Sequence, residues 1–227
     1  MRDVGESVIQ WHAFFTMPMN TAQDYETMSA YLDSTELHAQ HKWNARYQHT
    51  ASVPQAAHVL RENQHILPPT GRALDRACGL GGNALLLAEH GLDTWAWDIS
   101  DIAVARVQAA AQQRGIALHA EVRDAVACPP SPNSFDVIVV SHFLERDLAP
   151  TLIEALRPAG LLFYQTFTRV TVGETKGPMN PASRLATQEL VTLFHPLRIL
   201  VYREEGHIGD TTRGVRNEAM LVAQKLA

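Results

Sequence analysis

Apolar residues recur along the chain in two alternating patterns from residue 72 onward. Short apolar runs, typical of buried strands, lie at 72–75, 94–98, 116–122, 135–141 and 161–166. Between them, 83–90, 100–115 and 149–156 carry apolar residues at the spacing of one helix face. Strands that alternate with helices predict an α/β fold with a doubly wound, mostly parallel sheet.

The C-terminal part departs from this alternation. A long segment without periodicity, 167–183, predicts a functional loop, which we interpret as a wall of the substrate site. Thr187 is expected to cap a helix over 188–194. Strands are expected at 197–204 and 218–224, and the residues between them contain no helix pattern. Two strands without a crossover helix pair antiparallel, so we expect an antiparallel last strand.

The N-terminal third lacks the strand and helix alternation. We expect a tail over 1–20, a helical cap over 21–67 and the core domain over 68–227, because the breaker Pro68-Pro69-Thr70-Gly71 separates the last two. Five histidines between 38 and 65 match no metal-binding motif, so we assign them to solvated helix surface and expect no metal.

Composition excludes several classes of protein. The chain is 46% apolar and 19% charged, with a net charge of −5, and these values are typical of a soluble globular protein. The net negative charge gives no indication that the protein binds nucleic acid or an anionic membrane. Two cysteines without zinc spacing, no signal peptide and no apolar run of bilayer length predict a cytoplasmic protein, which we expect to be a monomer or homodimer.

A glycine-rich loop between the first strand and the first helix is the main candidate site. Glycines let a backbone approach a ligand closely, and a helix N-terminus offers free N–H groups. With Asp98 after the second strand, the spacing Gly79, Gly81, Ala84 resembles a dinucleotide fingerprint, which leaves an NAD(P)-dependent oxidoreductase as one reading. However, the carboxylate of Asp75 before the loop suits a cofactor without phosphates and with a positive charge.

Five motifs in order resemble those of class I S-adenosylmethionine (SAM) methyltransferases of the tellurite-resistance-like group. They are L-D-R-A-C-G-L-G-G-N at 74–83, W-D-I-S at 97–100, R-D-A at 123–125, F-D-V-I-V-V-S-H at 135–142 and L-R-P-A-G at 156–160. The resemblance implies a Rossmann-like sheet with an antiparallel last strand and SAM as cofactor, with S-adenosylhomocysteine as its product. Ala77 and Ala159 replace glycines of the family pattern.

The resemblance also implies which residues hold the cofactor. Asp75 would orient the amino-acid end, Asp98 would bind the ribose hydroxyls, and Ile99 would pack on adenine. Asp124 would accept a hydrogen bond from the adenine amino group, which we favour over the alternative of an aspartate that only forms a turn. The cofactor-binding candidates are Trp43, Arg46, Asp75, Ala77, Cys78, Gly79, Gly81, Asn83, Asp98, Ile99, Asp124, Ala125, Ser141 and His142.

Trp43 and Arg46 belong to a W-x-x-R-Y motif that recurs before related methyltransferase cores. Two interpretations remain for it: a lid over the cofactor, or an aromatic anchor that packs a helix on the core.

The expected partner is a small-molecule methyl acceptor. The chain lacks the D/N-P-P-Y/F motif that grips planar amines, and it has Ser141-His142-Phe143 in that place. A thiolate or telluride acceptor needs no base, whereas an oxygen or nitrogen acceptor needs one, for which His142 is the candidate. Arg184 is a candidate for holding an anionic acceptor. A non-catalytic SAM-binding regulator is the main alternative.

Overall fold

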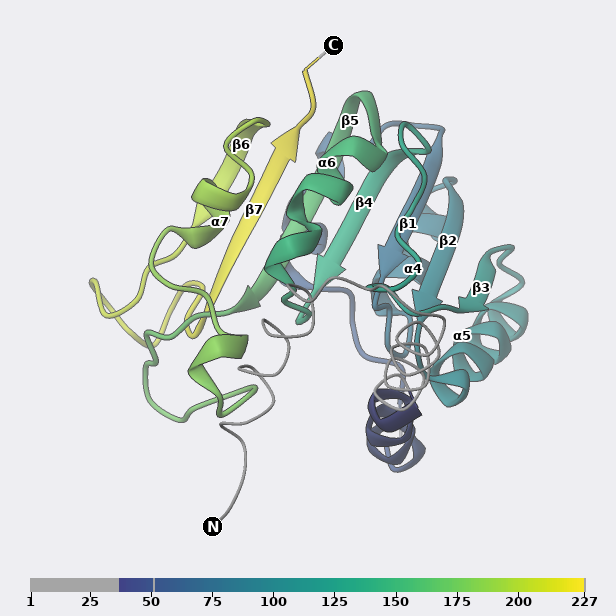
Figure 1. The fold of residues 1–227 in the computed structure, drawn as a ribbon, viewed down its shortest axis with the longest axis horizontal. Coiled ribbons are helices and arrows are strands. Elements are labelled where there is room, and N and C mark those ends of the chain that lie inside the picture. The colour runs from purple at the N-terminus through teal and green to yellow at the C-terminus, as the bar shows by residue number, and fades with distance from the viewer. Residues whose placement is uncertain (1–36, 51, 227) are drawn as a thin grey trace, which may run out of the picture. The chain divides into compact units, whose positions relative to one another are not determined.

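The computed structural model describes residues 37–50 and 52–226. Their centre is a seven-stranded sheet with the order β3-β2-β1-β4-β5-β7-β6 (Figure 1). The strands are β1 (Arg72–Arg76), β2 (Asp93–Asp98), β3 (His119–Val122), β4 (Phe135–Ser141), β5 (Leu156–Phe167), β6 (Arg198–Arg203) and β7 (Glu218–Gln224). Strand β7 pairs antiparallel with β5 and β6, and all other pairs are parallel, as the sequence predicted.

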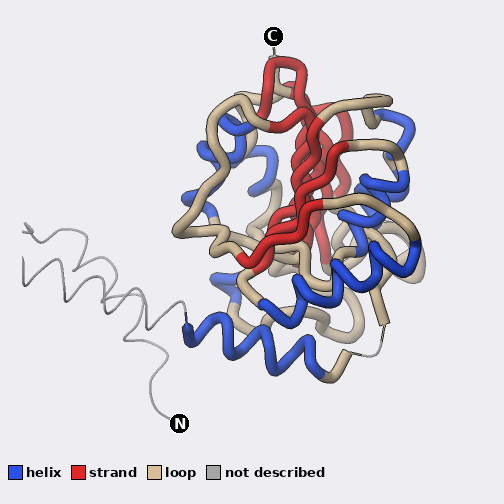
Figure 2. The backbone as a smooth tube through the Cα atoms, turned by 90° about the vertical axis from the view of Figure 1, so that its right-hand side faces the viewer, coloured by secondary structure: helices blue, strands red, loops and turns tan. Residues whose placement is uncertain are grey.

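Helices cover both faces of this sheet (Figure 2). They are α3 (His58–Glu62), α4 (Gly82–Glu89), α5 (Asp101–Arg114), α6 (Ala149–Ala155) and α7 (Glu189–Leu193), with 3₁₀ turns η1 (Gln64–Ile66), η2 (Arg146–Leu148) and η3 (Pro181–Ser183). Residues 37–48 form a further helix. The predicted tail 1–20 and the first part of the predicted cap lie outside the described residues. Residues 40–227 group into one compact unit by their contacts.

Strand β4 lies at the centre of the core and is buried on both faces. Ile138 and Val140 point into one apolar cluster, and Val137 and Val139 point into the other. All four are at most 1% exposed. The continuous apolar run predicted this double burial, since side chains of a strand alternate between its faces.

Most element boundaries follow local chemistry. The Ser100 hydroxyl accepts a hydrogen bond from the Ala103 N–H at 3.1 Å and so caps α5, which ends at Gly115 with a φ of 67°. Both ends were predicted from these residues. At α7 the expected cap was wrong: Gln188 occupies the N-cap position with no side-chain bond, and the Glu189 carboxylate accepts the Ala186 N–H instead.

Two strands differ from their predicted bounds by more than one residue. Strand β3 begins only at His119, three residues later than expected, because it has a single neighbour, β2, and pairs with it from that residue on. Strand β5 begins at Leu156, five residues earlier than expected. The register between β4 and β5 shifts at that point, so residues 157–160 bulge out of the strand.

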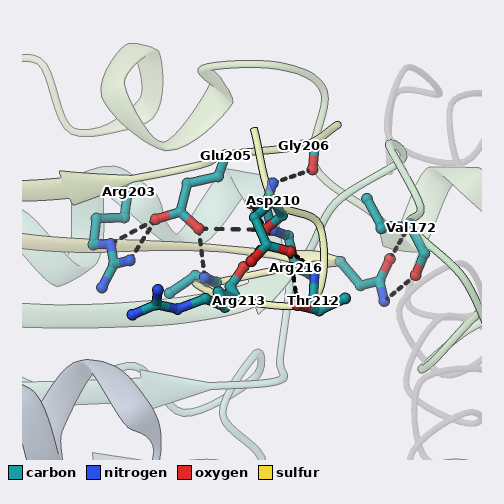
Figure 3. A network of polar contacts seen from close by, with 10 residues as sticks. Val172, Arg203, Glu205, Gly206, Asp210, Thr212, Arg213 and Arg216 are labelled. Carbon is teal, nitrogen blue, oxygen red and sulfur yellow. Dashed lines mark hydrogen bonds and ion pairs between the residues drawn. The ribbon is translucent and has the colours of Figure 1, made fainter. Parts of the chain in front are cut away.

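The connection between β6 and β7 is held by a polar network (Figure 3). The Glu205 carboxylate accepts hydrogen bonds from Arg203 and from the Val215 N–H at 2.6 Å. Arg216 donates to the carbonyls of Gly206 and Asp210. Asn217 then binds both the N–H and the carbonyl of Val172. The network therefore fixes the chain that leads into Glu218, the first residue of β7.

Candidate functional site

Asp75 lies near the carboxyl end of β1 with no exposed surface. Its carboxylate accepts hydrogen bonds from the Ala84 N–H at 3.0 Å and from the Asn83 amide at 3.2 Å. Burial raises the pKa of Asp75 to about 7, and the two hydrogen bonds oppose that rise. Asp75 thus binds the first turn of α4 from inside the protein and joins the strand to the helix across the glycine loop.

The loop between β1 and α4 runs through left-handed backbone conformations. Ala77, Gly79 and Gly81 have φ values of 53°, 52° and 80°. A Cβ on Gly81 would lie 2.6 Å from a methyl of Val107 in α5, so glycine is required there for packing as well as for φ. Burial raises the pKa of the Cys78 thiol far above its ordinary value, and Asp75 and Asp98 add to the effect. Cys78 is therefore a neutral, structural thiol.

Asp98 ends β2 beside this loop. Its two carboxylate oxygens accept hydrogen bonds from the Gly79 N–H at 2.8 Å and the Ser100 N–H at 2.9 Å. Asp98 is 4% exposed, and burial raises its pKa although these N–H groups oppose the effect. The fold thus brings Asp75, the glycine loop and Asp98 together, as the sequence predicted.

The helix over 37–48 packs against the loop through Tyr47. A Cβ placed on Gly79 would lie 2.9 Å from the Tyr47 hydroxyl oxygen. Asn44 donates to Asp101 at 2.7 Å, and Arg106 donates to the Tyr47 carbonyl at 2.8 Å. Burial raises the pKa of Tyr47, with a further contribution from the charge of Asp98. This helix therefore lies over the glycine loop, near Asp98.

Trp43 and Arg46, the two cap residues proposed from the sequence, lie on the same helix. The Trp43 ring stacks on the ring of Tyr47 at 5.7 Å, and the Arg46 guanidinium lies 5.4 Å from the Trp43 ring centroid. Tyr47, which the sequence reasoning did not single out as a site residue, makes the closest approach to the loop. Its signal was available as the last letter of the W-x-x-R-Y motif.

The N-terminus of α4 is covered by other parts of the chain. The carbonyl oxygen of Pro54 lies 2.6 Å from the position of a Cβ on Gly82, and that of Gln55 lies 2.9 Å from it. The Asn83 side chain accepts the Ala57 N–H at 2.8 Å. Carbonyl oxygens and a carboxylate at this helix end would repel a pyrophosphate, which in dinucleotide sites binds the free N–H groups. The geometry therefore argues against the dinucleotide alternative.

Asp124 and Ala125 follow β3 at the same edge of the sheet. The Asp124 carboxylate accepts the N–H groups of Val126 at 2.5 Å and Ala127 at 3.1 Å, and so forms a turn. The turn interpretation left open by the sequence is thus observed. Ala125 is buried, and Ile99 is partly buried, with its carbonyl bonded to the Gln40 amide at 3.1 Å.

Ser141 is the last residue of β4, near Asp75, and His142 follows it. The Asn83 amide that reaches Asp75 also donates to the Ser141 hydroxyl at 2.9 Å. His142 has a φ of 56°, and its Nε2 lies 3.0 Å from a carboxylate oxygen of Glu218. The sequence reasoning missed Glu218. An acid at the first position of an antiparallel last strand must lie at the carboxyl edge of the parallel strands, and this signal was present in the sequence.

Arg184 does not line an open acceptor site. It is 4% exposed, and its guanidinium donates to the carbonyls of Pro178 at 2.6 Å, Thr168 at 2.8 Å and Lys176. These bonds organise the loop between β5 and α7. The structure therefore corrects the expectation that Arg184 holds an anionic acceptor, because its donors already bind the protein backbone.

Other site types receive no support from residues 37–50 and 52–226. Within these ranges no group of three or more metal-binding side chains converges. No helix in the same ranges has the length and apolarity needed to cross a bilayer.

Comparisons with known proteins indicate a methyltransferase domain. Residues 73–160 match a family described as a methyltransferase domain. No curated protein matches the sequence significantly. A solved structure described by the conversion of a disulfide bond into a thioacetal group during echinomycin biosynthesis is similar with a TM-score of 0.62 and 23% identity, over 83% of this chain and 93% of that one.

Two further solved structures are similar in fold. TehB from Haemophilus influenzae has a TM-score of 0.57 and 21% identity, over 82% of this chain and 66% of its own. A SAM-dependent methyltransferase from Methanosarcina mazei has a TM-score of 0.58 and 20% identity, over 76% of this chain and 99% of its own. At these identities the structures establish a shared Rossmann-like fold, and the matched domain supports SAM-dependent methylation in general.

Proposed function

Because residues 73–160 match a methyltransferase domain and the sheet has the Rossmann-like methyltransferase fold, we propose that this protein transfers a methyl group from SAM to a small-molecule acceptor. The observation that carries the proposal is the environment of the glycine loop. Asp75 and two backbone carbonyls lie at the end of α4, where a phosphate would bind, and the Asp98 carboxylate lies beside the loop, where it would bind the ribose hydroxyls.

The residues present suit this cofactor chemically. Asp98 would bind the ribose hydroxyls through the lone pairs that its two N–H donors leave free. Ile99 and Ala125 would supply apolar contacts for the adenine ring. Asp124 would accept from the adenine amino group through its second carboxylate oxygen, since the turn uses only the first. Asp75 and Ser141, which share the Asn83 amide, would orient the charged amino-acid end.

The cofactor, when bound, supplies a methyl group on a positive sulfonium that an acceptor attacks in line. The protein then contributes mainly position and exclusion of water. Tyr47 and the helix that carries it would hold the cofactor in the loop, while the rigid ends of β1 and β4 would fix the direction of attack. His142 would remove a proton from an oxygen or nitrogen acceptor.

We place the protein in the tellurite-resistance-like group of small-molecule methyltransferases. This finer proposal is supported by the five ordered motifs and by the similarity to TehB over 82% of this chain. We also propose that the protein is cytoplasmic, that it acts as a monomer or homodimer, and that it needs neither nucleic acid nor a membrane.

Titration calorimetry of S-adenosylhomocysteine tests the cofactor. We expect micromolar binding by the wild type, loss of at least tenfold in affinity in Asp98→Ala, and no heat from NADH in parallel. The matched control is Asp93→Ala at the other end of β2, which should bind like the wild type. NADH binding, or no binding of S-adenosylhomocysteine, would contradict the proposal. Binding without turnover of any acceptor would indicate a SAM-binding regulator.

A further inference from the structure

Three side chains form a continuous hydrogen-bonded chain where β4, β5 and β7 meet. His142 Nε2 lies 3.0 Å from Glu218 Oε1, and the Gln165 amide donates to the second oxygen of Glu218. The side-chain carbonyl oxygen of Gln165 accepts a hydrogen bond from the backbone N–H of Val59 at 2.7 Å. Because a backbone N–H only donates, this last bond fixes the orientation of the Gln165 amide, and its NH₂ group must point to Glu218.

The chain holds the imidazole in one orientation. The backbone N–H of His142 donates to the backbone carbonyl of Gln165 at 2.8 Å. The centroid of the imidazole ring lies 4.9 Å from that of the Phe167 ring, and the backbone of His142 has a left-handed φ of 56°. Such a φ is strained for a histidine and persists only where the surroundings impose it. The Glu218 carboxylate accepts a hydrogen bond from Nε2–H, so the lone pair of the neutral ring remains on Nδ1.

The two ends of the pair differ in exposure. The His142 side chain is 43% exposed, whereas that of Glu218 is 19% exposed. Burial alone would raise the pKa of Glu218, but the bond and charge of His142, with Gln165 and Lys176, lower it below its ordinary value. An ionised, sheltered carboxylate behind a partly exposed imidazole is the arrangement that stabilises an imidazolium formed during a reaction.

The position of the pair relates it to the proposed cofactor site. His142 follows Ser141, whose hydroxyl shares the Asn83 amide with Asp75. Asp75 and Ser141 are the residues that would hold the amino-acid end of the cofactor, next to the sulfonium. Asn217, the residue that precedes Glu218 in the chain, is anchored on the backbone of Val172.

We propose that His142 and Glu218 form a general-base dyad and that the methyl acceptor is a hydroxyl group of an alcohol or phenol. This inference rests on the proposed function. The acceptor oxygen forms the new bond to the methyl carbon, the carbon–sulfur bond breaks with its electron pair left on sulfur, and the hydroxyl proton moves to Nδ1 of His142. Glu218 is the positioning residue, since it acts through the imidazole. The proton is later released to water.

The acceptor class follows from what a base contributes. A thiol such as that of cysteine ionises near pH ~8.5 and attacks readily, whereas a phenol such as that of tyrosine ionises near pH ~10. A partly buried carboxylate that orients an imidazole does not help a thiolate, which has already lost its proton. For a hydroxyl, general-base assistance is worth on the order of 10²–10⁴ in rate.

Matched acceptors test the dyad directly. Labelled SAM is supplied with a panel of alcohols and 4-substituted phenols and with the corresponding thiols, at pH 7.5. We expect His142→Asn to lower kcat for hydroxyl acceptors by about 10²-fold, and Glu218→Gln by about tenfold, with KM little changed. Thiol turnover, where present, should stay within about threefold. Glu218→Asp should restore part of the rate, and the control Glu121→Gln on β3 should have no effect.

Two measurements separate the dyad from a purely structural contact and from a failure of the proposed function. In ¹⁵N-histidine spectra, the wild type should keep the proton of His142 on Nε2, and Glu218→Gln should lose this preference. All variants should bind S-adenosylhomocysteine like the wild type. If binding is intact but no hydroxyl compound is methylated, or the variants slow thiols and hydroxyls equally, the dyad is refuted. If the wild type does not bind S-adenosylhomocysteine, the proposed function itself fails.

Discussion

Two alanines stand where the related motifs have glycine, and both adopt left-handed backbone conformations. Ala77 has a φ of 53° and Ala159 a φ of 64°. Each substitution adds one methyl group to its turn. The backbone adds a different cost, because an L residue in this region is less stable by about 1–2 kcal/mol. The substitutions therefore store strain in the turns that border the sheet.

Ala159→Gly is expected to stabilise the protein. Ala159 is exposed and lies in the bulge near the start of β5, so a glycine there removes strain without opening a cavity. Glycine also loses more conformational entropy on folding, which leaves a net gain of about 0.5–1 kcal/mol in the free energy of unfolding. Urea unfolding measures it. The control is Ala105→Gly on the exposed face of α5, which should cost about 1 kcal/mol; a loss of stability at both positions would contradict the argument.

At the scale of elements, the sequence predicted the parts that depend on local patterns. The buried run of β4, the Ser100 cap and the antiparallel β7 all follow from periodicity, capping chemistry and connection length. Contacts between distant segments were not predictable in this way. Three such contacts join segments that no local rule places together: Tyr47 with Gly79, Val59 with Gln165, and Glu218 with His142.

The docking of the 37–48 helix on the glycine loop gives a prediction at this scale. In Gly79→Ala, the new Cβ would lie 2.9 Å from the Tyr47 hydroxyl oxygen and 3.4 Å from the next ring carbon. We expect a loss of about 2 kcal/mol in the wild type, of which about 1 kcal/mol reflects the φ of 52° and the rest the clash.

Tyr47→Phe removes only the clashing oxygen, so Gly79→Ala should cost less in that background. A double-mutant cycle of unfolding free energies should give a coupling of about 0.5–1 kcal/mol. Gly81→Ala serves as the control, because its Cβ would meet Val107 instead, and its cost should be the same in both backgrounds. A coupling near zero at Gly79 would mean that the helix does not rest on the loop in solution.

At the scale of the whole molecule, the chain before the sheet and the sheet itself are linked through the site. Asn83 and Gln165, both buried, bind the backbone N–H groups of Ala57 and Val59. The same two side chains contact Asp75 and Glu218. Asp75 and Glu218 are thus each linked by two hydrogen bonds, through one intervening side chain, to the segment that precedes the sheet, so the site depends on how this segment packs on the sheet.

The free energy of unfolding should therefore change with pH as Asp75 ionises. Its ordinary pKa of 3.8 rises to about 7 in the folded protein, chiefly through burial. Between these values the folded state binds a proton that the unfolded state has released, so stability falls as pH rises through this window. At about 1.4 kcal/mol for each pH unit, the loss amounts to about 4 kcal/mol between pH 4 and pH 7. Asp98 contributes in the same direction because its pKa is also raised.

Asp75→Asn removes this titration and should flatten the dependence. Unfolding by urea at pH 5, 6, 7 and 8 gives the slope, which is more informative than the absolute stability because the substitution also changes the bonds to Ala84 and Asn83. The guanidinium of Arg76, whose pKa burial lowers to about 10, titrates outside the window. Asp147→Asn, an exposed control in η2, should keep the wild-type slope. If Asp75→Asn keeps it as well, the carboxylate is ionised throughout, and the orienting charge proposed for the cofactor would be fully present at neutral pH.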